Sequence, residues 1–331
     1  MTHDPPSGED SLIARYFKPL ATDPGAFGLV DDAAIIKADG DDIVVKTDAI
    51  VEGVHYLPDD PPDAIAKKAL RVNLSDLAAK GATPAGFVLT LALRKADDAW
   101  LSAFARGLGE DAASFGCPLL GGDTVSTPGP VMISIAAWGR VPSGRMVHRF
   151  GAMPADGVFV TGTIGDAVLG LDVLKGGAAA KALASDPAAR EMLVGRYRVP
   201  QPRNALAATV RDFATASMDV SDGLAGDLAK LCAASGVSAD IQLSRLPTSS
   251  AANSLLTLGA ARIETLISGG DDYEILCTVP AAQRDGFLAA AGRVGVAVTE
   301  IGTVVAGMAR PRFLDGRGAE ISLKHLSFSH F

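Results

Sequence analysis

The chain has 331 residues, a length at which two domains are the default, and its 48% hydrophobic content suits a globular enzyme with a sizeable core. The formal net charge of −8 and the lack of a basic run argue against a nucleic-acid-binding surface, so an anionic substrate would need metal cations as intermediaries. The 3 cysteines lack the spacing of a disulfide framework or a zinc site. With no signal-peptide pattern and no apolar stretch long enough to span a bilayer, we expect a cytoplasmic protein without a membrane segment.

The first half of the chain alternates between predicted strands and helices. Residues 33–38 and 42–47 form an expected hairpin around a tight turn. The segment 61–81 is predicted to be one helix, because it is entered at a proline and its apolar residues recur on one face. FVLTLAL and VMISIAAW are expected strands, with a helix from about 97 to 115 between them, and CPLLGGDTV is predicted to end in a Gly-Gly-Asp loop.

A stretch containing Gly, Pro and Arg at 139–157 precedes a new predicted strand, VFVTG, and we place the domain boundary there, at residue 150. The predicted domains are therefore 1–150 and 151–331. The second half alternates again, with a helix around 166–175, a strand at ADIQL and a loop followed by a strand in SGGDDYEILCTV. These patterns predict an α/β protein, with some α+β character, built from two domains.

The stretch MDVSDGLAGDLAKL, at residues 218–231, crowds acidic and hydroxyl side chains at the start of an apolar helix. Ser and Asp are favoured N-caps, and acids there also complement the helix dipole. One cap and one dipole partner would account for Ser221 and Asp222, but Asp219 would remain unexplained. Taken alone, the motif is compatible with a capped helix and with a binding site.

Other acids fall near the ends of predicted elements, where a single acid is usually just solvated. Asp76 resists this interpretation, because it lies three positions from Asn73 on a helix whose neighbouring leucines are buried. A carboxylate at the edge of that inward face needs a partner. Asp123 follows two glycines that let a phosphate or an ion approach the backbone. The remaining candidate acids are Asp31, Asp32, Asp48, Asp271 and Asp272.

If several of these acids converge, they repel one another strongly, by about 4 kcal/mol for two unit charges ~4 Å apart at an effective dielectric near 20. Divalent cations with oxygen ligands are the natural remedy, and Mg²⁺ typically combines one or two carboxylates with waters and substrate phosphates. Acid-lined sites of this kind serve phosphoryl transfer. Other chemistries are poorly supported, because the sequence lacks a Walker A motif, a kinase catalytic loop and a convincing dinucleotide-binding glycine motif.

Eight motifs, in this order over nearly the whole chain, resemble those of the thiamine-monophosphate kinases, in the superfamily of aminoimidazole ribonucleotide synthetase and selenophosphate synthetase. They are GEDSLIARYF, VDDAA, KTDAIVEGVHY, VNLSDLAAKGATP, LLGGDT, DVSDGL, SGGDDYE and the terminal HF. The resemblance implies two α/β domains and a homodimer formed through a sheet or barrel of the N-terminal domains. It also implies ATP held by several Mg²⁺ ions, and in-line transfer of its γ-phosphoryl group to thiamine monophosphate.

Position by position, the resemblance implies three sets of site residues and no acid or base catalyst. The implied metal ligands are Asp32, Thr47, Asp48, Asp76, Asp123, Asp219 and Asp222. The implied ATP contacts are Gly122, Asp123, Arg149 and Ser221. The implied substrate contacts are His55 and Asp271, with the C-terminal segment around His325 and Phe328 closing over thiamine. The alternative for Arg149 is a solvated loop arginine, and the alternative for His55 is a packed histidine at a strand end.

The chain departs from the family pattern at Val30, where glycine is usual, at Lys46, where a small hydroxyl residue is usual, and at Ala105 and His325, where aromatic residues are common. Lys46 puts a side-chain metal contact at that position in doubt. Two rival interpretations are an ATP-dependent synthetase of the superfamily with a different acceptor, and a catalytically silent nucleotide- or metal-binding module. Selenophosphate synthetase is disfavoured because no cysteine lies near the N-terminus.

Overall fold

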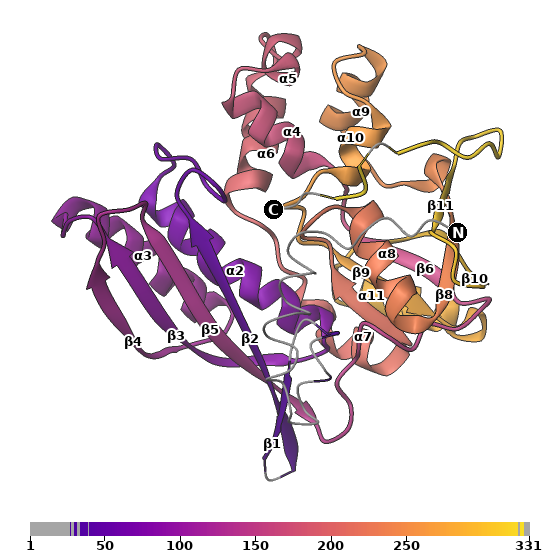
Figure 1. The fold of residues 1–331 in the computed structure, drawn as a ribbon, viewed down its shortest axis with the longest axis horizontal. Coiled ribbons are helices and arrows are strands. Elements are labelled where there is room, and N and C mark those ends of the chain that lie inside the picture. The colour runs from indigo at the N-terminus through magenta and orange to yellow at the C-terminus, as the bar shows by residue number, and fades with distance from the viewer. Residues whose placement is uncertain (1–26, 28–29, 32–33, 39, 324, 328–331) are drawn as a thin grey trace.

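The computed structural model describes residues 27, 30–31, 34–38, 40–323 and 325–327. These residues form two lobes, each built on its own sheet, which meet along helix α2 (Pro62–Ala79) (Figure 1). The two mixed sheets with their helices confirm the predicted α/β class. Within the described part of the chain, no helix is both long and apolar enough to cross a membrane.

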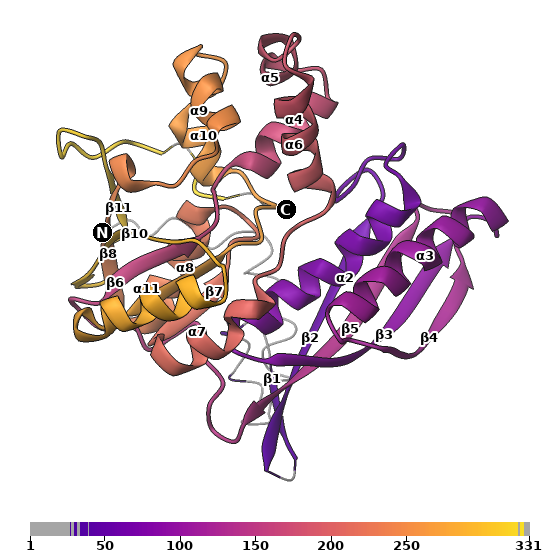
Figure 2. The ribbon, with the colours of Figure 1, turned by 180° about the vertical axis from the view of Figure 1, so that it is seen from behind.

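The first lobe is a five-stranded sheet in the order β1-β2-β5-β3-β4, antiparallel except for the parallel pair β3 and β4. Helices α2 and α3 cover one face of this sheet, as the two opposite views show (Figures 1 and 2). The remaining elements of this lobe are β1 (Ala34–Lys37), β2 (Asp41–Val51), β3 (Thr83–Leu93), α3 (Asp98–Ser114), β4 (Leu119–Ser126) and β5 (Met132–Pro142).

The second lobe is a six-stranded mixed sheet in the order β11-β8-β10-β6-β9-β7. Its strands are β6 (Gly157–Thr161), β7 (Ala216–Asp219), β8 (Val237–Gln242), β9 (Ile275–Val279), β10 (Val298–Ala306) and β11 (Arg312–Leu314). Its helices are α4 (Asp166–Leu174), α5 (Ala178–Ala182), α6 (Pro187–Arg198), α7 (Ala207–Phe213), α8 (Leu224–Ser235), α9 (Ser250–Thr257), α10 (Ile263–Ser268) and α11 (Arg284–Arg293). The central strands β6 and β9 are wholly buried, because helices cover the sheet.

Helix α2 carries the junction between the lobes. Its apolar residues pack on β2 and β5 of the first sheet, while its other side contacts β7, β9 and α7 of the second lobe. The sequence pattern predicted one inward face, but the second lobe covers the other face as well. Polar side chains of α2, among them Lys68 and Asp76, are therefore buried too, as is Lys80, the C-cap residue of the helix. A buried charge needs a partner, so this helix is where charged groups from both lobes must meet.

The predicted hairpin and the helix 61–81 are confirmed as β1 with β2 and as α2, within one or two residues at each end except that β2 runs four residues beyond its predicted end, to Val51. The Gly-Gly-Asp segment is different. Gly122 and Asp123 lie inside β4, which pairs in parallel with β3, and not in a loop. Gly122 has φ +157°, and a Cβ atom there would meet the Leu89 backbone, so the glycine permits this strand pairing rather than opening a loop.

The predicted boundary at residue 150 falls between β5 and β6, the last strand of the first sheet and the first strand of the second. The division into 1–150 and 151–331 stays a prediction, and one contact already crosses it, because Ser217 N–H of β7 donates to the His148 carbonyl over 2.8 Å. The first sheet is open among the described residues, with β1 and β4 at its edges, so a barrel would require a second copy of the chain.

Candidate active site

Three carboxylates from three elements face the junction of the lobes. Asp48 lies on β2, Asp76 near the end of α2, and Asp219 at the end of β7. Asp76 and Asp219 are only 4% and 3% exposed. The ammonium of Lys46, also on β2, lies 2.9 Å from Asp76 and 3.3 Å from Asp48. We call Lys46, Asp48, Asp76 and Asp219 the acid cluster.

The acid cluster is short of positive charge. Burial, together with repulsion from Asp219, raises the pKa of Asp76 well above its usual value, and burial also raises the pKa of Asp219. Burial would lower the pKa of Lys46, but Asp48 and Asp76 raise it above its usual value. The buried Asp219 Oδ2 atom has no hydrogen-bond partner among the described residues. These are the signs of carboxylates arranged for a cation.

The donor set fits Mg²⁺, because its atoms are carboxylate oxygens and one of them is buried without a partner. Among the described residues, no group of three or more Asp, Glu, His or Cys side chains could hold an ion alone. An ion bound here would therefore take its other ligands from water or from substrate oxygens. That division of ligands is the usual one for Mg²⁺ at phosphoryl-transfer sites.

Beside the cluster, Asp31 holds together the two segments that carry predicted ATP and metal contacts. The Lys80 ammonium lies 2.6 Å from Asp31, and it also donates to the Ser217 carbonyl over 3.1 Å. The backbone N–H of Arg149 donates to Asp31 over 3.1 Å, and the His148 ring lies 3.3 Å away. Burial opposes the charge on Asp31, but the His148 hydrogen bond and Lys80 hold its pKa well below its usual value.

The motif DVSDGL is an anchored loop and not a capped helix. Helix α8 begins at Leu224 after Gly223, and within the described residues no side chain caps it. Asp227, on the first turn of α8, instead accepts hydrogen bonds from the backbone N–H groups of Ser221 and Asp222, over 3.0 and 2.9 Å. The Lys230 ammonium lies 2.5 Å from Asp222. The helix-cap alternative for Ser221 and Asp222 is therefore wrong, and Asp227 fixes the loop that follows Asp219.

A second group of charged residues joins the lobes further along α2. The ammonium of Lys68 is 3.0 Å from Asp271 and donates to the His55 carbonyl over 2.8 Å. It also lies 3.9 Å from the centroid of the Tyr197 ring, a cation–π contact. Lys68 is 1% exposed while the Asp271 side chain is 27% exposed, so the pair joins a buried cation to a carboxylate that still reaches the surface. Asp271 has φ +71°, a conformation uncommon outside glycine, and its N–H donates to the Ser221 carbonyl over 2.8 Å.

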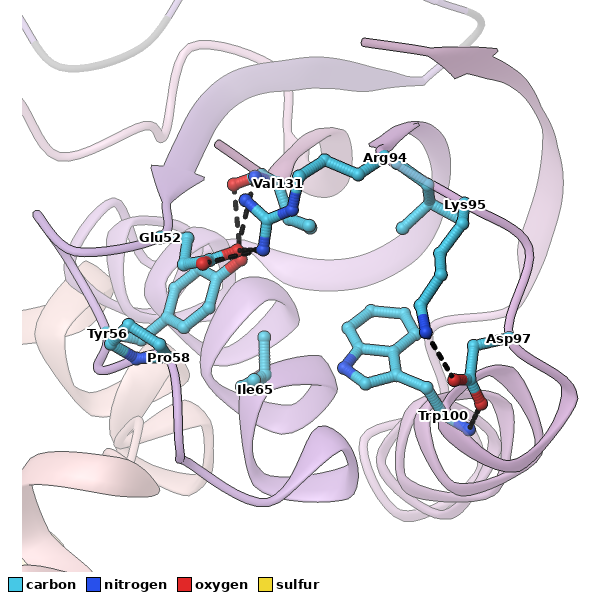
Figure 3. Close-up of a pocket in the computed structure, with 10 residues that line it drawn as sticks. Glu52, Tyr56, Pro58, Ile65, Arg94, Lys95, Asp97, Trp100 and Val131 are labelled. Carbon is cyan, nitrogen blue, oxygen red and sulfur yellow. Dashed lines mark hydrogen bonds and ion pairs between the residues drawn. The ribbon is translucent and has the colours of Figure 1, made fainter. Parts of the chain in front are cut away.

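His55 is oriented by its own loop. Its ring Nδ1 accepts the Val51 N–H over 3.0 Å, so the neutral ring carries its proton on Nε2. A pocket of about 170 Å³ lies beside this loop, with Glu52 and Arg94 pointing toward one another in it (Figure 3). Arg94 donates to both Glu52 oxygens over 2.7 Å, and Tyr56 donates to the Val131 carbonyl. These contacts brace the loop on both sides of His55.

Some predicted site residues lie outside both groups. Gly122 and Asp123 are exposed on β4, the far edge of the first sheet. Asp48 and Gly122 lie at the same level across the sheet, because Asp48 pairs with Ile135, Ile135 with Leu89 and Leu89 with Gly122. Three strand spacings, about 14 Å, therefore separate them. The Thr47 hydroxyl donates to the Ile135 carbonyl, and His325 is exposed. Asp32 and Phe328 lie outside the described residues.

Four residues that organise the site were not assigned this role from the sequence: Lys46, Lys68, Lys80 and Asp227. The signal for Lys68 was its place on a helix among alanines and leucines, where a lysine is unusual unless it is paired. Lys80 stands at the end of the same helix, where a solvated lysine is ordinary, so nothing in the pattern marked it. In the sequence, Lys46 is distinctive only as a departure from the family pattern. Its contact with Asp76 depends on how β2 and α2 pack, which the sequence pattern does not report.

The fold places this protein in the class of two-domain AIR synthase related proteins. The family model "AIR synthase related protein, N-terminal domain" matches residues 30–141, and its C-terminal counterpart matches 154–310. A solved structure described as HypE in complex with ATP, at 18% identity and a TM-score of 0.70, shares the fold over 99% of this chain and 97% of its own.

More similar relatives narrow the class. The thiamine-monophosphate kinase of Caulobacter vibrioides is 42% identical over 98% of this chain and 91% of its own. That of Escherichia coli (strain K12) is 38% identical over 98% of each chain. A solved structure described as AaThiL complexed with AMPPCP and TMP has a TM-score of 0.78 at 29% identity, covering 93% of this chain and 97% of its own. This chain therefore belongs to the thiamine-monophosphate kinase family.

Proposed function

We propose that this protein transfers the γ-phosphoryl group of ATP in line onto the phosphate of thiamine monophosphate, giving thiamine diphosphate and ADP. The observation that carries this proposal is the placement of two charged groups along one helix. Asp76 of the acid cluster and Lys68 with its partners stand eight positions apart on α2, about 12 Å along the helix axis. A related kinase has been solved with an ATP analogue and TMP, which supports this choice of donor and acceptor.

The acid cluster is the phosphoryl-transfer end of the proposed site. We assign Asp32, Thr47, Asp48, Asp76, Asp123, Asp219 and Asp222 as ligands of several Mg²⁺ ions. When bound, Mg²⁺ neutralises charge on the phosphates, which is what transfer between two anions requires. Thr47 donates its hydroxyl proton to a strand carbonyl, which leaves oxygen lone pairs available to a cation.

The Lys68 group is the acceptor end. Because Lys68 already neutralises one oxygen of Asp271, the other oxygen is suited to accept a hydrogen bond from the pyrimidine amine. His55, with its proton on Nε2, is a donor suited to a substrate oxygen. His325 and Phe328 would close over thiamine, while Gly122, Arg149 and Ser221 would contact ATP. No residue needs to act as a general acid or base, because positioning and charge neutralisation carry the step.

We also propose a homodimer formed through the first lobe. Strand β4 is an exposed sheet edge with three large exposed apolar side chains: Leu119 (49%), Leu120 (60%) and Val125 (44%). An edge of this kind pairs readily with another chain. Gly122 and Asp123 lie on the same strand, about 14 Å from Asp48 within one chain. A dimer through β4 would therefore bring these residues against the second copy.

The remaining assignments follow the same line. We place the ATP, Mg²⁺ and dimer functions in domain 1–150 and the second α/β domain in 151–331. A cytoplasmic location is supported by the cysteines Cys117, Cys232 and Cys277, which are all free thiols as expected in a reducing compartment.

One assay tests the proposed reaction directly. Purified protein is incubated with Mg-ATP and thiamine monophosphate, and thiamine diphosphate and ADP are measured in equal amounts. Phosphoryl transfer to another acceptor, with none to thiamine monophosphate, would identify a synthetase of the same superfamily. Binding of ATP without any turnover would instead identify a silent binding module. The buried Asp219 Oδ2 atom, which has no hydrogen-bond partner among the described residues, is suited to a metal ion and favours the enzyme over the silent module.

A further inference from the structure

Lys46 occupies the position between two carboxylates that a cation would occupy. Its ammonium is 2.9 Å from Asp76 Oδ2 and 3.3 Å from Asp48 Oδ1, and the lysine side chain is only 15% exposed. Asp48 and Asp76 come from different elements, β2 and α2, so the ammonium ties the strand to the helix. Burial of a lysine ammonium is unfavourable unless carboxylates compensate its charge, so the position of Lys46 depends on its pairing with Asp48 and Asp76.

The charges in the cluster do not balance, which points to a further cation. Three carboxylates, Asp48, Asp76 and Asp219, face the ammonium of Lys46, and the only other positive charge acting on Asp219 among the described residues is Lys80, which is already paired with Asp31. The unmatched charge is concentrated at Asp219, whose buried Oδ2 atom has no hydrogen-bond partner among the described residues. The cluster therefore has one position already filled by the protein's own cation and one that is still open.

We propose that Lys46 is a resident cation of the acid cluster, which takes the place of one divalent ion between Asp48 and Asp76. This inference rests on the proposed Mg-ATP-dependent function. The ammonium and a divalent ion would compete for the same two oxygens and would repel each other at such short range. Any divalent ion that Asp48 or Asp76 binds would then use the carboxylate oxygen that Lys46 does not contact, together with Asp219 and the nucleotide.

A comparison of bound ions in matched variants tests the proposal. Mn²⁺ bound per chain is counted by equilibrium dialysis with electron paramagnetic resonance, in the presence of a non-hydrolysable ATP analogue. Lys46→Ser removes the ammonium and supplies an oxygen ligand, so it should bind one more Mn²⁺ than the unchanged protein. Lys46→Arg keeps the charge and should bind the same number. Lys67→Ser, which removes a surface lysine paired with Glu110, is the matched control.

Melting without metal gives a second readout. Lys46→Ser should melt at a lower temperature than the unchanged protein in chelator, and Mn²⁺ should raise its melting temperature more than that of Lys46→Arg. If Lys46→Ser folds only when Mn²⁺ is present, that outcome supports the proposal in its strongest form. If Lys46→Ser binds no more Mn²⁺ than the unchanged protein, the proposal is overturned.

The unchanged protein provides a test that needs no variant. Crystals grown with Mn²⁺ and the ATP analogue should show, by anomalous scattering, no Mn²⁺ between Asp48 and Asp76, with the Lys46 ammonium there instead. An anomalous peak bridging the two carboxylates, with Lys46 turned away, would overturn the proposal. The ion positions are independent of turnover. A failure to make thiamine diphosphate would therefore count against the proposed function alone.

Discussion

At the scale of single residues, the buried lysines of α2 organise the site. Lys68 is 1% exposed and Lys80 is not exposed at all, yet each ammonium has a carboxylate and a backbone carbonyl as partners. Burial of a charge is tolerated only with such partners, and removal of one partner costs about 3–5 kcal/mol. Each lysine therefore ties a segment of the second lobe to the first: Lys68 holds the loop that carries Asp271, and Lys80 holds strand β7, which ends at Asp219.

Replacement of Asp219 by Asn should separate catalysis from folding. The amide removes a buried negative charge that Asp48 and Asp76 repel, so the metal-free melting temperature should be unchanged or slightly higher. Turnover should fall by roughly 100-fold or more, because a group that neutralises transition-state charge is lost. Asp240→Asn, at a partly exposed carboxylate paired with the exposed Arg312, is the control and should affect neither quantity. A large loss of metal-free stability with normal turnover would show that Asp219 is structural.

Replacement of Asp271 by Ala should affect the acceptor and spare the nucleotide. KM for thiamine monophosphate should rise by roughly 10- to 150-fold, since a hydrogen bond to a charged group contributes about 1.5–3 kcal/mol. KM for ATP should be nearly unchanged, as expected when only acceptor binding is lost. Steady-state kinetics with each substrate varied in turn measure both values.

The structure adds a control for that experiment. Asp271→Ala also leaves the buried Lys68 ammonium without its carboxylate, so Asp271→Asn, which keeps a side-chain oxygen, separates binding from stability. Asp271→Asn should fold normally and still raise KM for thiamine monophosphate. If KM for ATP rises instead in either variant, Asp271 lies on the nucleotide side of the site.

At the scale of elements, hydrophobic periodicity was informative wherever one face of a segment is buried. It placed the β1–β2 hairpin and α2 correctly, with only the end of β2 off by more than two residues, because their apolar residues do face the core. It was wrong for Gly122 and Asp123, where glycines indicated a loop and the chain instead forms β4. Gly122 is tolerated there because its backbone approaches Leu89 of β3 closely, a tertiary contact that no local pattern reports.

Strand β4 is the element on which the dimer prediction depends. Leu120→Asp places a charge on the exposed apolar edge, so the variant should be monomeric at micromolar concentration while its circular dichroism spectrum is unchanged. Leu258→Asp alters a leucine of similar exposure, 66% against 60%, on the second lobe, and should remain dimeric. Sedimentation velocity measures the mass. A monomeric unchanged protein, or a Leu120→Asp variant that still dimerises, would contradict the proposed interface.

At the scale of the whole molecule, the site is a product of how the lobes pack, and this is why the sequence alone could identify its acids but not their partners. Lys68 and Asp271 are 203 positions apart, and Ser75 reaches the Tyr273 carbonyl across 198 positions. The ordered motifs marked the carboxylates because their residue types are distinctive. The partner lysines are harder to identify: Lys68 is marked only by its place among apolar helix residues, and Lys80 is not marked at all, because a lysine at a helix end is ordinary until a second lobe covers it.

The same arrangement leads to a prediction about the reaction path. The proposed donor and acceptor ends are both centred on α2, at Asp76 and Lys68, so both substrates can be held together and transfer can be direct. The usual alternative is a phosphorylated enzyme intermediate, which needs a reactive nucleophilic side chain. The described cysteines and His55 are poorly suited to that role. Burial raises the pKa of the Cys117 thiol to about 11 and of the Cys232 and Cys277 thiols to about 12, which removes the thiolates at neutral pH. His55 uses Nδ1 to hold its own loop.

We therefore expect ternary-complex kinetics, with intersecting and not parallel lines when both substrates are varied. No exchange of label between ADP and ATP should occur without thiamine monophosphate, because no phosphoryl group leaves ATP until the acceptor is bound. Iodoacetamide at pH 7 should leave the native enzyme active, since its three thiols are buried and protonated. Exchange in the absence of the acceptor, or a stable phosphohistidine at position 55, would exclude direct transfer. Isolation of that intermediate by rapid quench with labelled ATP is the decisive measurement.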